Sequence, residues 1–215
     1  MKWNTSSKEF ENFLKFERNL SKNTISGYLA DLKKLIDYLS QKNINYNPNQ
    51  ITSDLIREFL YSQSKKIKSS TQGRLISSLN LFFDFMILEK IIVENPLEKI
   101  DYPKVGSSIP ATLTTTEIDL LIAEAGLNKN NGLRNETIIE VLYSCGLRVS
   151  ELIDLKISDL FLDENLIKVL GKGNKERFVP VSNTAKKLIV EYIESIRNFK
   201  KIKKGHEDTL FINNR

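Results

Sequence analysis

The fold of this chain is decided by the stretch Ser144-Cys145-Gly146-Leu147-Arg148-Val149-Ser150-Glu151-Leu152, which follows an apolar helical segment. Gly146 can take the left-handed conformation that ends a helix, so the first helix is expected to stop there. A second helix then begins, and Arg148 lies at the break between the two helices instead of on a solvated face. The planar fork of donors on an arginine suits a phosphate. Glu151, on the same face of the second helix, can fix the orientation of this guanidinium group.

A second motif lies downstream. Two apolar segments, residues 166–170 and 177–181, flank the turn Gly171-Lys172-Gly173-Asn174-Lys175-Glu176. This pattern predicts a β-hairpin with Lys172 and Lys175 at its tip. The glycines beside Lys172 let the backbone approach another molecule closely, and a lysine there can reach into a nucleic-acid groove. Taken singly, neither motif is specific, since the arginine and glutamate could form a structural ion pair and the turn could simply be exposed.

Together and in this order, the two motifs resemble the first half of the catalytic domain of tyrosine recombinases, the λ-integrase-like family, and most closely its bacterial Xer type. The resemblance implies that Arg148 binds the scissile phosphate and that Lys172 protonates the departing 5′ oxygen. It also implies that Glu151 supports the site without being the nucleophile. These residue types agree with phosphoryl transfer, which needs charge stabilisation at the non-bridging oxygens and a proton for the leaving oxygen.

The family pattern continues with a His-x-x-Arg box, a further His or Trp, and a tyrosine nucleophile near the C-terminus. The only histidine, His206, has no arginine three residues later. All seven tyrosines lie before the place of the nucleophile: Tyr28, Tyr38, Tyr46, Tyr61, Tyr102, Tyr143 and Tyr192. We therefore expect a sequence truncated before these boxes, which holds half of an active site and does not cleave DNA by itself.

The residues before this region resemble the N-terminal core-binding domain of the same family, a helical (SAM-like) clamp on DNA. Apolar residues at helical spacing predict four helices within residues 1–100. Residues 101–110, with prolines, glycine and serines, are expected to be a linker, and residues 111–215 the N-terminal portion of an incomplete catalytic domain. The expected fold class is mainly α with a small β-hairpin or sheet.

Polar residues at the starts of two of these helices are candidate DNA contacts. A helix N-terminus with hydroxyl and basic side chains can bind a DNA phosphate. The predicted DNA-binding residues are Lys22, Asn23, Thr24, Ser70, Thr71, Arg74 and, at the hairpin tip, Lys175. Each of them could equally belong to a solvated charged surface.

Composition sets broader limits. The net charge of +5 and the pI near 9.1 favour an acidic partner, and most of the positive excess falls in the first half. A single cysteine excludes an intramolecular disulfide framework and fits a reducing compartment. The first residues lack the apolar core of a signal peptide, and no run approaches the ~20 apolar residues of a membrane span. The sequence therefore predicts a cytoplasmic protein without a membrane partner, and it has no metal-ligand cluster.

The resemblance implies site-specific DNA recombination or integration. A tyrosine attacks the phosphate, a phosphotyrosine intermediate forms, and a 5′ hydroxyl reverses the step, so no cofactor is expected. The implied partners are double-stranded DNA and further recombinase subunits that form a tetramer on two DNA sites. The alternative is a non-catalytic DNA-binding protein, or a remnant, that occupies recombination sites.

Overall fold

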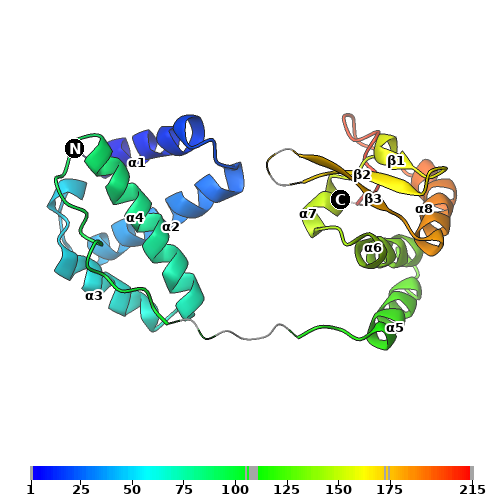
Figure 1. Ribbon diagram of the computed structural model, residues 1–215, viewed down its shortest axis with the longest axis horizontal. Helices are drawn as coiled ribbons and strands as arrows, with labels where there is room; N and C mark the ends of the chain where they lie inside the picture. Colours follow the sequence, from blue (N-terminus) through cyan, green and yellow to red (C-terminus); the bar gives the residue numbers. More distant parts are fainter. Residues whose placement is uncertain (1, 105, 107–110, 172, 174, 214–215) are drawn as a thin grey trace. The chain divides into compact units, whose positions relative to one another are not determined.

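The computed structural model describes residues 2–104, 106, 111–171, 173 and 175–213. The chain divides into two compact units, Met1–Ile109 and Pro110–Arg215, called here the N-terminal and the C-terminal unit. The described residues are mainly helical, with one small sheet in the C-terminal unit, as the sequence predicts (Figure 1).

Four α-helices build the described part of the N-terminal unit. α1 continues into a π-helical turn, and a short 3-10 helix precedes α3. The elements are α1 (Trp3–Asn12), η1 (Phe13–Glu17), α2 (Lys22–Gln41), η2 (Pro48–Gln50), α3 (Ser53–Ser64) and α4 (Ser69–Leu88). α2 begins where the Ser21 hydroxyl accepts a hydrogen bond from the Thr24 N–H, and α3 begins in the same way at Thr52. Such side-chain caps satisfy N–H groups that lack a partner at a helix start.

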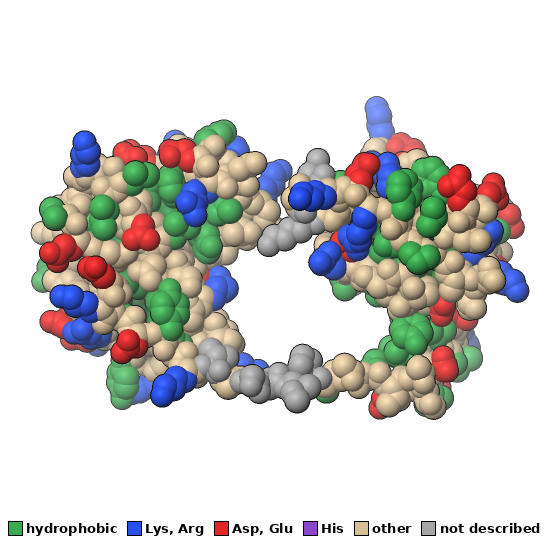
Figure 2. Space-filling model, in the orientation of Figure 1, with side chains coloured by type: hydrophobic (Ala, Val, Ile, Leu, Met, Phe, Trp, Pro, Cys, Tyr) green, Lys and Arg blue, Asp and Glu red, His purple; other side chains and the backbone are tan. Residues whose placement is uncertain are grey.

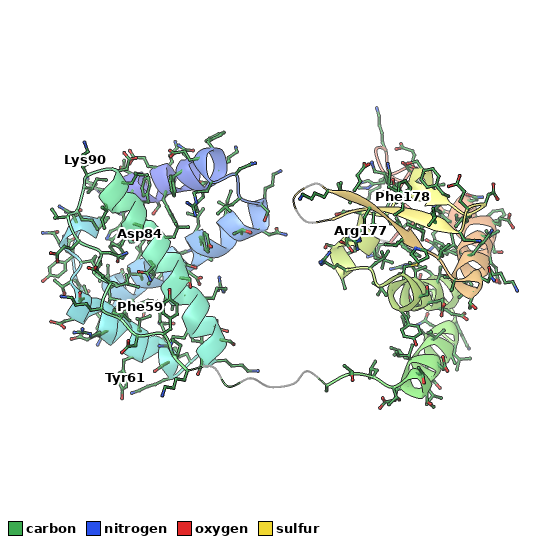
Figure 3. The ribbon with its side chains drawn as sticks, in the orientation of Figure 1. Phe59, Tyr61, Asp84, Lys90, Arg177 and Phe178 are labelled. Carbon is green, nitrogen blue, oxygen red and sulfur yellow. The ribbon has the colours of Figure 1, made fainter. Side chains whose placement is uncertain are left out.

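α4 is the centre of the N-terminal core, because it packs against both α2 and α3. Phe82 of α4 is fully buried and contacts three aromatic rings, those of Trp3, Phe10 and Phe83, at centroid distances of 6.0, 5.3 and 5.1 Å. In Figure 3, Phe59 of α3 lies within the unit and Tyr61 lies at its edge. Their exposed fractions agree with this, at 0% for Phe59 and 66% for Tyr61. On the face shown in Figure 2, basic and acidic side chains are interspersed over this unit.

The C-terminal unit places helices around a three-stranded antiparallel sheet with the strand order β1-β2-β3. The predicted hairpin is β2 and β3, and a two-residue strand, β1, extends it. The elements are α5 (Thr115–Gly126), α6 (Gly132–Cys145), α7 (Val149–Ile153), η3 (Ile157–Asp159), β1 (Leu160–Phe161), β2 (Leu166–Leu170), β3 (Glu176–Pro180), α8 (Asn183–Ser195) and η4 (Arg197–Phe199). α6 packs against both α5 and α8, and α5 lies on the side of α6 away from the sheet (Figure 1).

A buried cluster beneath the sheet joins these elements. It includes Val141 of α6, Leu152 of α7, Val169 of β2 and Ile189 of α8. Cys145, the last residue of α6, is buried in the same cluster, and its burial raises the pKa of the thiol. The core therefore fixes the end of α6 and the start of α7 against the sheet, so the two sequence motifs lie side by side.

Candidate active site

Arg148 lies at the break between α6 and α7, as the sequence predicts. Gly146 ends α6 with a φ of 60° and a ψ of 34°, which is the left-handed region that favours glycine. Arg148 is the N-cap residue of α7, in an extended backbone conformation. Its side chain is 68% exposed, so most of the guanidinium group is open to a ligand.

Glu151 accepts hydrogen bonds from Arg148. Its side chain is only 4% exposed. Oε2 accepts a hydrogen bond of 2.8 Å from the Arg148 backbone N–H, and Oε1 accepts one of 2.7 Å from Arg148 Nη1. The carboxylate therefore fixes both the backbone and the side chain of the arginine, which is the supporting position expected for it.

Arg177 of β3 also binds Glu151, and this contact was missed by the sequence reasoning. Its Nη1 donates to Oε1 at 2.8 Å and its Nη2 donates to Oε2 at 2.9 Å, in the two-pronged geometry that arginine forms with a carboxylate. In Figure 3, Arg177 points from β3 toward α7 while Phe178 points to the other face of the sheet. We call Arg148, Glu151 and Arg177 the arginine–glutamate cluster.

The alternation of exposed and less exposed residues along β3 indicates which way the Arg177 side chain points. Val179 and Val181 alternate with exposed residues, so residues 177, 179 and 181 point toward the core. A charged side chain at such a position needs a partner of opposite charge. The sequence does not say which carboxylate that partner is, because Glu151 lies 26 residues away.

The cluster borders an open pocket. Its lining residues are Gly146, Arg148, Gly171, Lys175, Glu176 and Arg177. The pocket thus brings together Arg148 and Lys175, two of the predicted site residues. Lys172, the predicted proton donor, lies outside the described residues, as does Asn174. His206 lies elsewhere, in a second pocket with Lys168 and Phe211.

The protonation of Glu151 predicts a pH dependence. Hydrogen bonds from Arg177, and then from the Arg148 backbone, lower the pKa of Glu151 from 4.5 to about 2. Because the folded-state pKa is the lower one, the resulting stabilisation is complete above about pH 4.5 and is lost as the pH falls through about 2. We expect Glu151→Gln to lower the unfolding temperature of the C-terminal unit at pH 7, and this difference from wild type to shrink across that acidic range. A difference that stays constant down to pH 2 would contradict the assignment. Because Glu117, Glu207 and Asp208 also have lowered pKa values, only the comparison with the variant isolates Glu151.

The predicted DNA contacts of the N-terminal unit lie at two helix starts. Lys22, Asn23 and Thr24 form the exposed first turn of α2. Ser70 and Thr71 lie in the first turn of α4, which has no side-chain cap, and Arg74 follows one turn later. α2 packs against α4, and a Cβ added at Gly27 of α2 would lie 3.6 Å from Arg74 Nη1, so the Arg74 side chain reaches α2.

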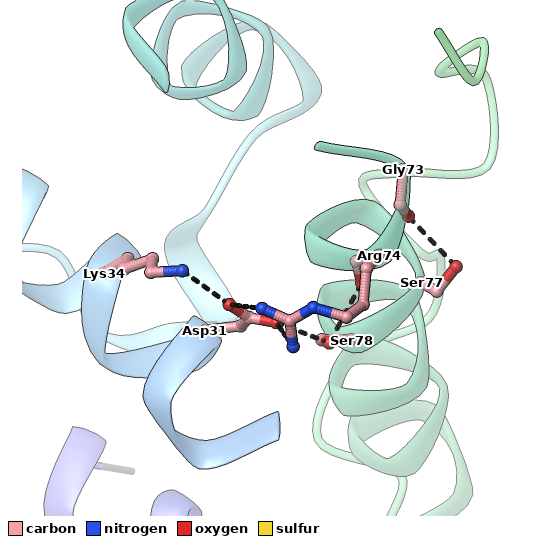
Figure 4. A network of polar contacts seen from close by, with 6 residues as sticks. All are labelled: Asp31, Lys34, Gly73, Arg74, Ser77 and Ser78. Atoms are coloured by element: carbon pink, nitrogen blue, oxygen red, sulfur yellow. Dashed lines mark hydrogen bonds and ion pairs between the residues drawn. The ribbon is translucent and has the colours of Figure 1, made fainter. Parts of the chain in front are cut away.

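Arg74 does not project freely into solvent. It forms an ion pair with Asp31 of α2, with Nη1 at 2.7 Å from Oδ2 (Figure 4). Asp31 is completely buried and also accepts hydrogen bonds from Lys34 and Ser78. The side chain of Arg74 is still 49% exposed, so the ion pair holds the arginine at the surface and leaves part of it accessible.

Two classes of feature are missing from the described residues. No group of three or more His, Cys, Asp or Glu side chains among them could hold a metal ion. None of the described helices combines the length and the apolar character that crossing a bilayer requires.

Comparison with known proteins covers both units. Residues 8–90 match the domain family described as "Phage integrase, N-terminal SAM-like domain", and residues 111–215 match the "Phage integrase family". The chain is 39% identical over 206 residues to tyrosine recombinase XerD of Oceanobacillus iheyensis, covering 95% of this chain and 69% of that relative. It is 37% identical over 211 residues to XerD of Staphylococcus epidermidis, covering 98% and 71%.

A solved structure supports the same fold. A lambda integrase dimer bound to a COC′ core site matches with a TM-score of 0.74 at 20% sequence identity, covering 99% of this chain and 57% of that chain. The helical N-terminal unit, the arginine at the α6–α7 break and the sequence identity to the XerD proteins lead to one assignment. The chain belongs to the phage integrase family, as a XerD-like tyrosine recombinase of site-specific recombination.

Proposed function

We propose that this chain binds duplex DNA and presents Arg148 to the scissile phosphate of a recombination site. The observation that carries this proposal is the arginine–glutamate cluster. It combines two arginines with one buried carboxylate, so it has a net charge of +1 beside an open pocket. An exposed guanidinium group whose orientation is fixed can bind the non-bridging oxygens of a phosphate and stabilise the charge that develops there.

The remaining roles follow the chemistry of the family. In the reaction of the family, a tyrosine oxygen attacks phosphorus and the bond to the 5′ oxygen breaks, and Lys172 of this chain would donate the proton that this leaving oxygen needs. Glu151 orients Arg148. The N-terminal unit contributes a clamp at the starts of α2 and α4, where Lys22 and Arg74 would contact phosphates of the backbone. Double-stranded DNA and further recombinase subunits, assembled as a tetramer on two sites, are the proposed partners.

Salt dependence tests the binding part of this proposal. Five predicted phosphate contacts, Lys22, Arg74, Arg148, Lys172 and Lys175, give an expected slope of about −4.5 for the logarithm of affinity against the logarithm of salt concentration. Fluorescence anisotropy with a labelled duplex at several salt concentrations measures it. Arg148→Ala should retain most of the affinity and reduce the slope by about one, because one contact among several is lost. Binding that does not depend on salt would contradict the proposal.

The position of the tyrosines gives a second expectation. None of the seven tyrosines lines the pocket at Arg148, although all seven lie in the described part of the chain. We therefore expect salt-sensitive binding of a nicked suicide duplex without a denaturation-resistant protein–DNA adduct. Gel electrophoresis under denaturing conditions detects such an adduct. Its formation would mean that one of these tyrosines reaches the phosphate, and the expectation of an incomplete site would be wrong.

A further inference from the structure

We infer that Arg177 is a positioning residue for phosphate binding, because it neutralises the charge of Glu151 and so leaves the charge of Arg148 available to the phosphate. The inference rests on the proposed function, since it concerns the same phosphate site. It adds a residue from the sheet to a site whose predicted members lie on the α6–α7 break and at the hairpin tip.

Charge balance is the first argument. Glu151 is needed to orient Arg148, yet a carboxylate beside the arginine cancels its charge and repels an anion. The pKa of Glu151, about 2, keeps this carboxylate ionised at neutral pH. Arg148 and Glu151 alone would form a neutral pair. With Arg177 included, the cluster carries one positive charge, so the carboxylate can act as a support without weakening anion binding.

The division of hydrogen bonds is the second argument. Arg177 gives both terminal nitrogens to the two oxygens of Glu151. Within the part of the chain that the structure describes, the Arg148 guanidinium group gives the carboxylate only Nη1, so Nη2 and Nε keep their hydrogens for a ligand. The exposed fractions agree with this, at 68% for the side chain of Arg148 and 38% for that of Arg177. Both arginines line the pocket, but Arg177 gives both terminal nitrogens to the carboxylate, whereas Arg148 keeps Nη2 and Nε for a ligand.

The close fit around Gly171 is the third argument. A Cβ added to Gly171 would lie 3.0 Å from Arg177 Nη1 and 3.7 Å from Glu151 Oε1. The cluster thus occupies the space beside the last described residue before Lys172. The N–H of Gly171 also donates to the Lys175 carbonyl oxygen at 2.7 Å. Arg177 therefore ties the base of the hairpin to Glu151 and so to Arg148.

The test measures anion binding at Arg148 directly. Inorganic phosphate is titrated into the nitrogen-15-labelled full chain, and the Nε–Hε signal of Arg148 is followed by NMR. Arg177→Met removes the charge and keeps an apolar chain of similar length, and we expect it to weaken phosphate binding about fivefold to tenfold. The double variant Glu151→Gln with Arg177→Met removes both charges and keeps one oxygen that can accept a hydrogen bond from Arg148. We expect it to recover part of the lost affinity, to within about threefold of wild type, since Arg148 again provides the +1 charge.

Two controls separate charge from structure. Lys168→Met removes a cation from the opposite face of the same sheet, where Lys168 pairs with Asp159 and Glu176, and it should change phosphate affinity less than about twofold. Arg177→Lys keeps the charge and loses the fork, and it should stay within about twofold of wild type. The lysine variant also keeps the test decisive if the methionine variant does not fold.

Each outcome decides the matter. Wild-type affinity in Arg177→Met would show that Arg177 has only a structural role. An equal loss in the single and the double variants would show that Arg177 itself holds the phosphate. A loss of roughly tenfold in Arg177→Lys would show that charge is not what Arg177 supplies, and a wild-type Arg148 signal that ignores phosphate would remove the site altogether. Failure of the wild-type chain to bind duplex DNA would instead defeat the proposed function, while the phosphate titration still judges the inference.

Discussion

Replacing Phe82 with alanine should lower the free energy of unfolding of the N-terminal unit by about 3–5 kcal/mol. Phe82 is fully buried in the second half of α4 and contacts the rings of Trp3, Phe10 and Phe83. The substitution removes apolar contacts and leaves a cavity that neighbouring rings can fill only in part. Because small domains are stable by only about 5–15 kcal/mol, this loss would bring the unit close to unfolding at room temperature.

The chain contains a spectroscopic reporter for this experiment. Trp3 is the only tryptophan and its ring stacks on Phe82, so its fluorescence follows the N-terminal unit during urea unfolding. Leu88→Ala, at the exposed end of the same helix, is the matched control and should change the midpoint little. Equal losses for the two variants would mean that the buried ring does not stabilise the unit.

Replacing Glu151 with alanine should lower the free energy of unfolding of the C-terminal unit by about 2–3 kcal/mol. The change removes every hydrogen bond that the carboxylate accepts and leaves Arg148 and Arg177 close together without a counter-charge. Breaking a buried ion pair costs about 3–5 kcal/mol, and the figure is reduced here because both arginines remain partly solvated.

A matched surface pair provides the control. Asp54 and Arg57 form an ion pair of 2.9 Å with the same spacing of three residues, but both side chains are mostly exposed. Asp54→Ala should therefore cost less than about 1 kcal/mol. Circular dichroism follows the helices of both units, and Trp3 fluorescence identifies the N-terminal transition. If Glu151→Ala shifts the N-terminal transition seen by Trp3 fluorescence and leaves the C-terminal transition unchanged, the prediction is contradicted.

Local rules predicted much of the fold. The left-handed Gly146 and the helix break before Arg148 follow from the few residues around them. The hairpin of β2 and β3 and the buried aromatic face of α4 follow from the spacing of apolar residues. These features depend on neighbours in sequence, which is why a single chain reveals them.

Long-range pairings could not be predicted in the same way. Arg177 meets Glu151 across 26 residues, and Arg74 meets Asp31 across 43 residues. In the sequence both arginines look like ordinary basic residues, and Asp31 is one of two aspartates on α2, with Asp37. Only the packing of β3 against α7, and of α4 against α2, decides which carboxylate each arginine finds.

The burial of Cys145 has a practical consequence for experiments in solution. It is the only thiol in the sequence, it is buried at the end of α6, and its raised pKa leaves little of the reactive thiolate at neutral pH. Maleimide reagents should therefore modify the native chain slowly. A cysteine introduced on an exposed helix of the C-terminal unit could then carry a single fluorophore, and the distance from Trp3 to that fluorophore could be followed without first replacing Cys145.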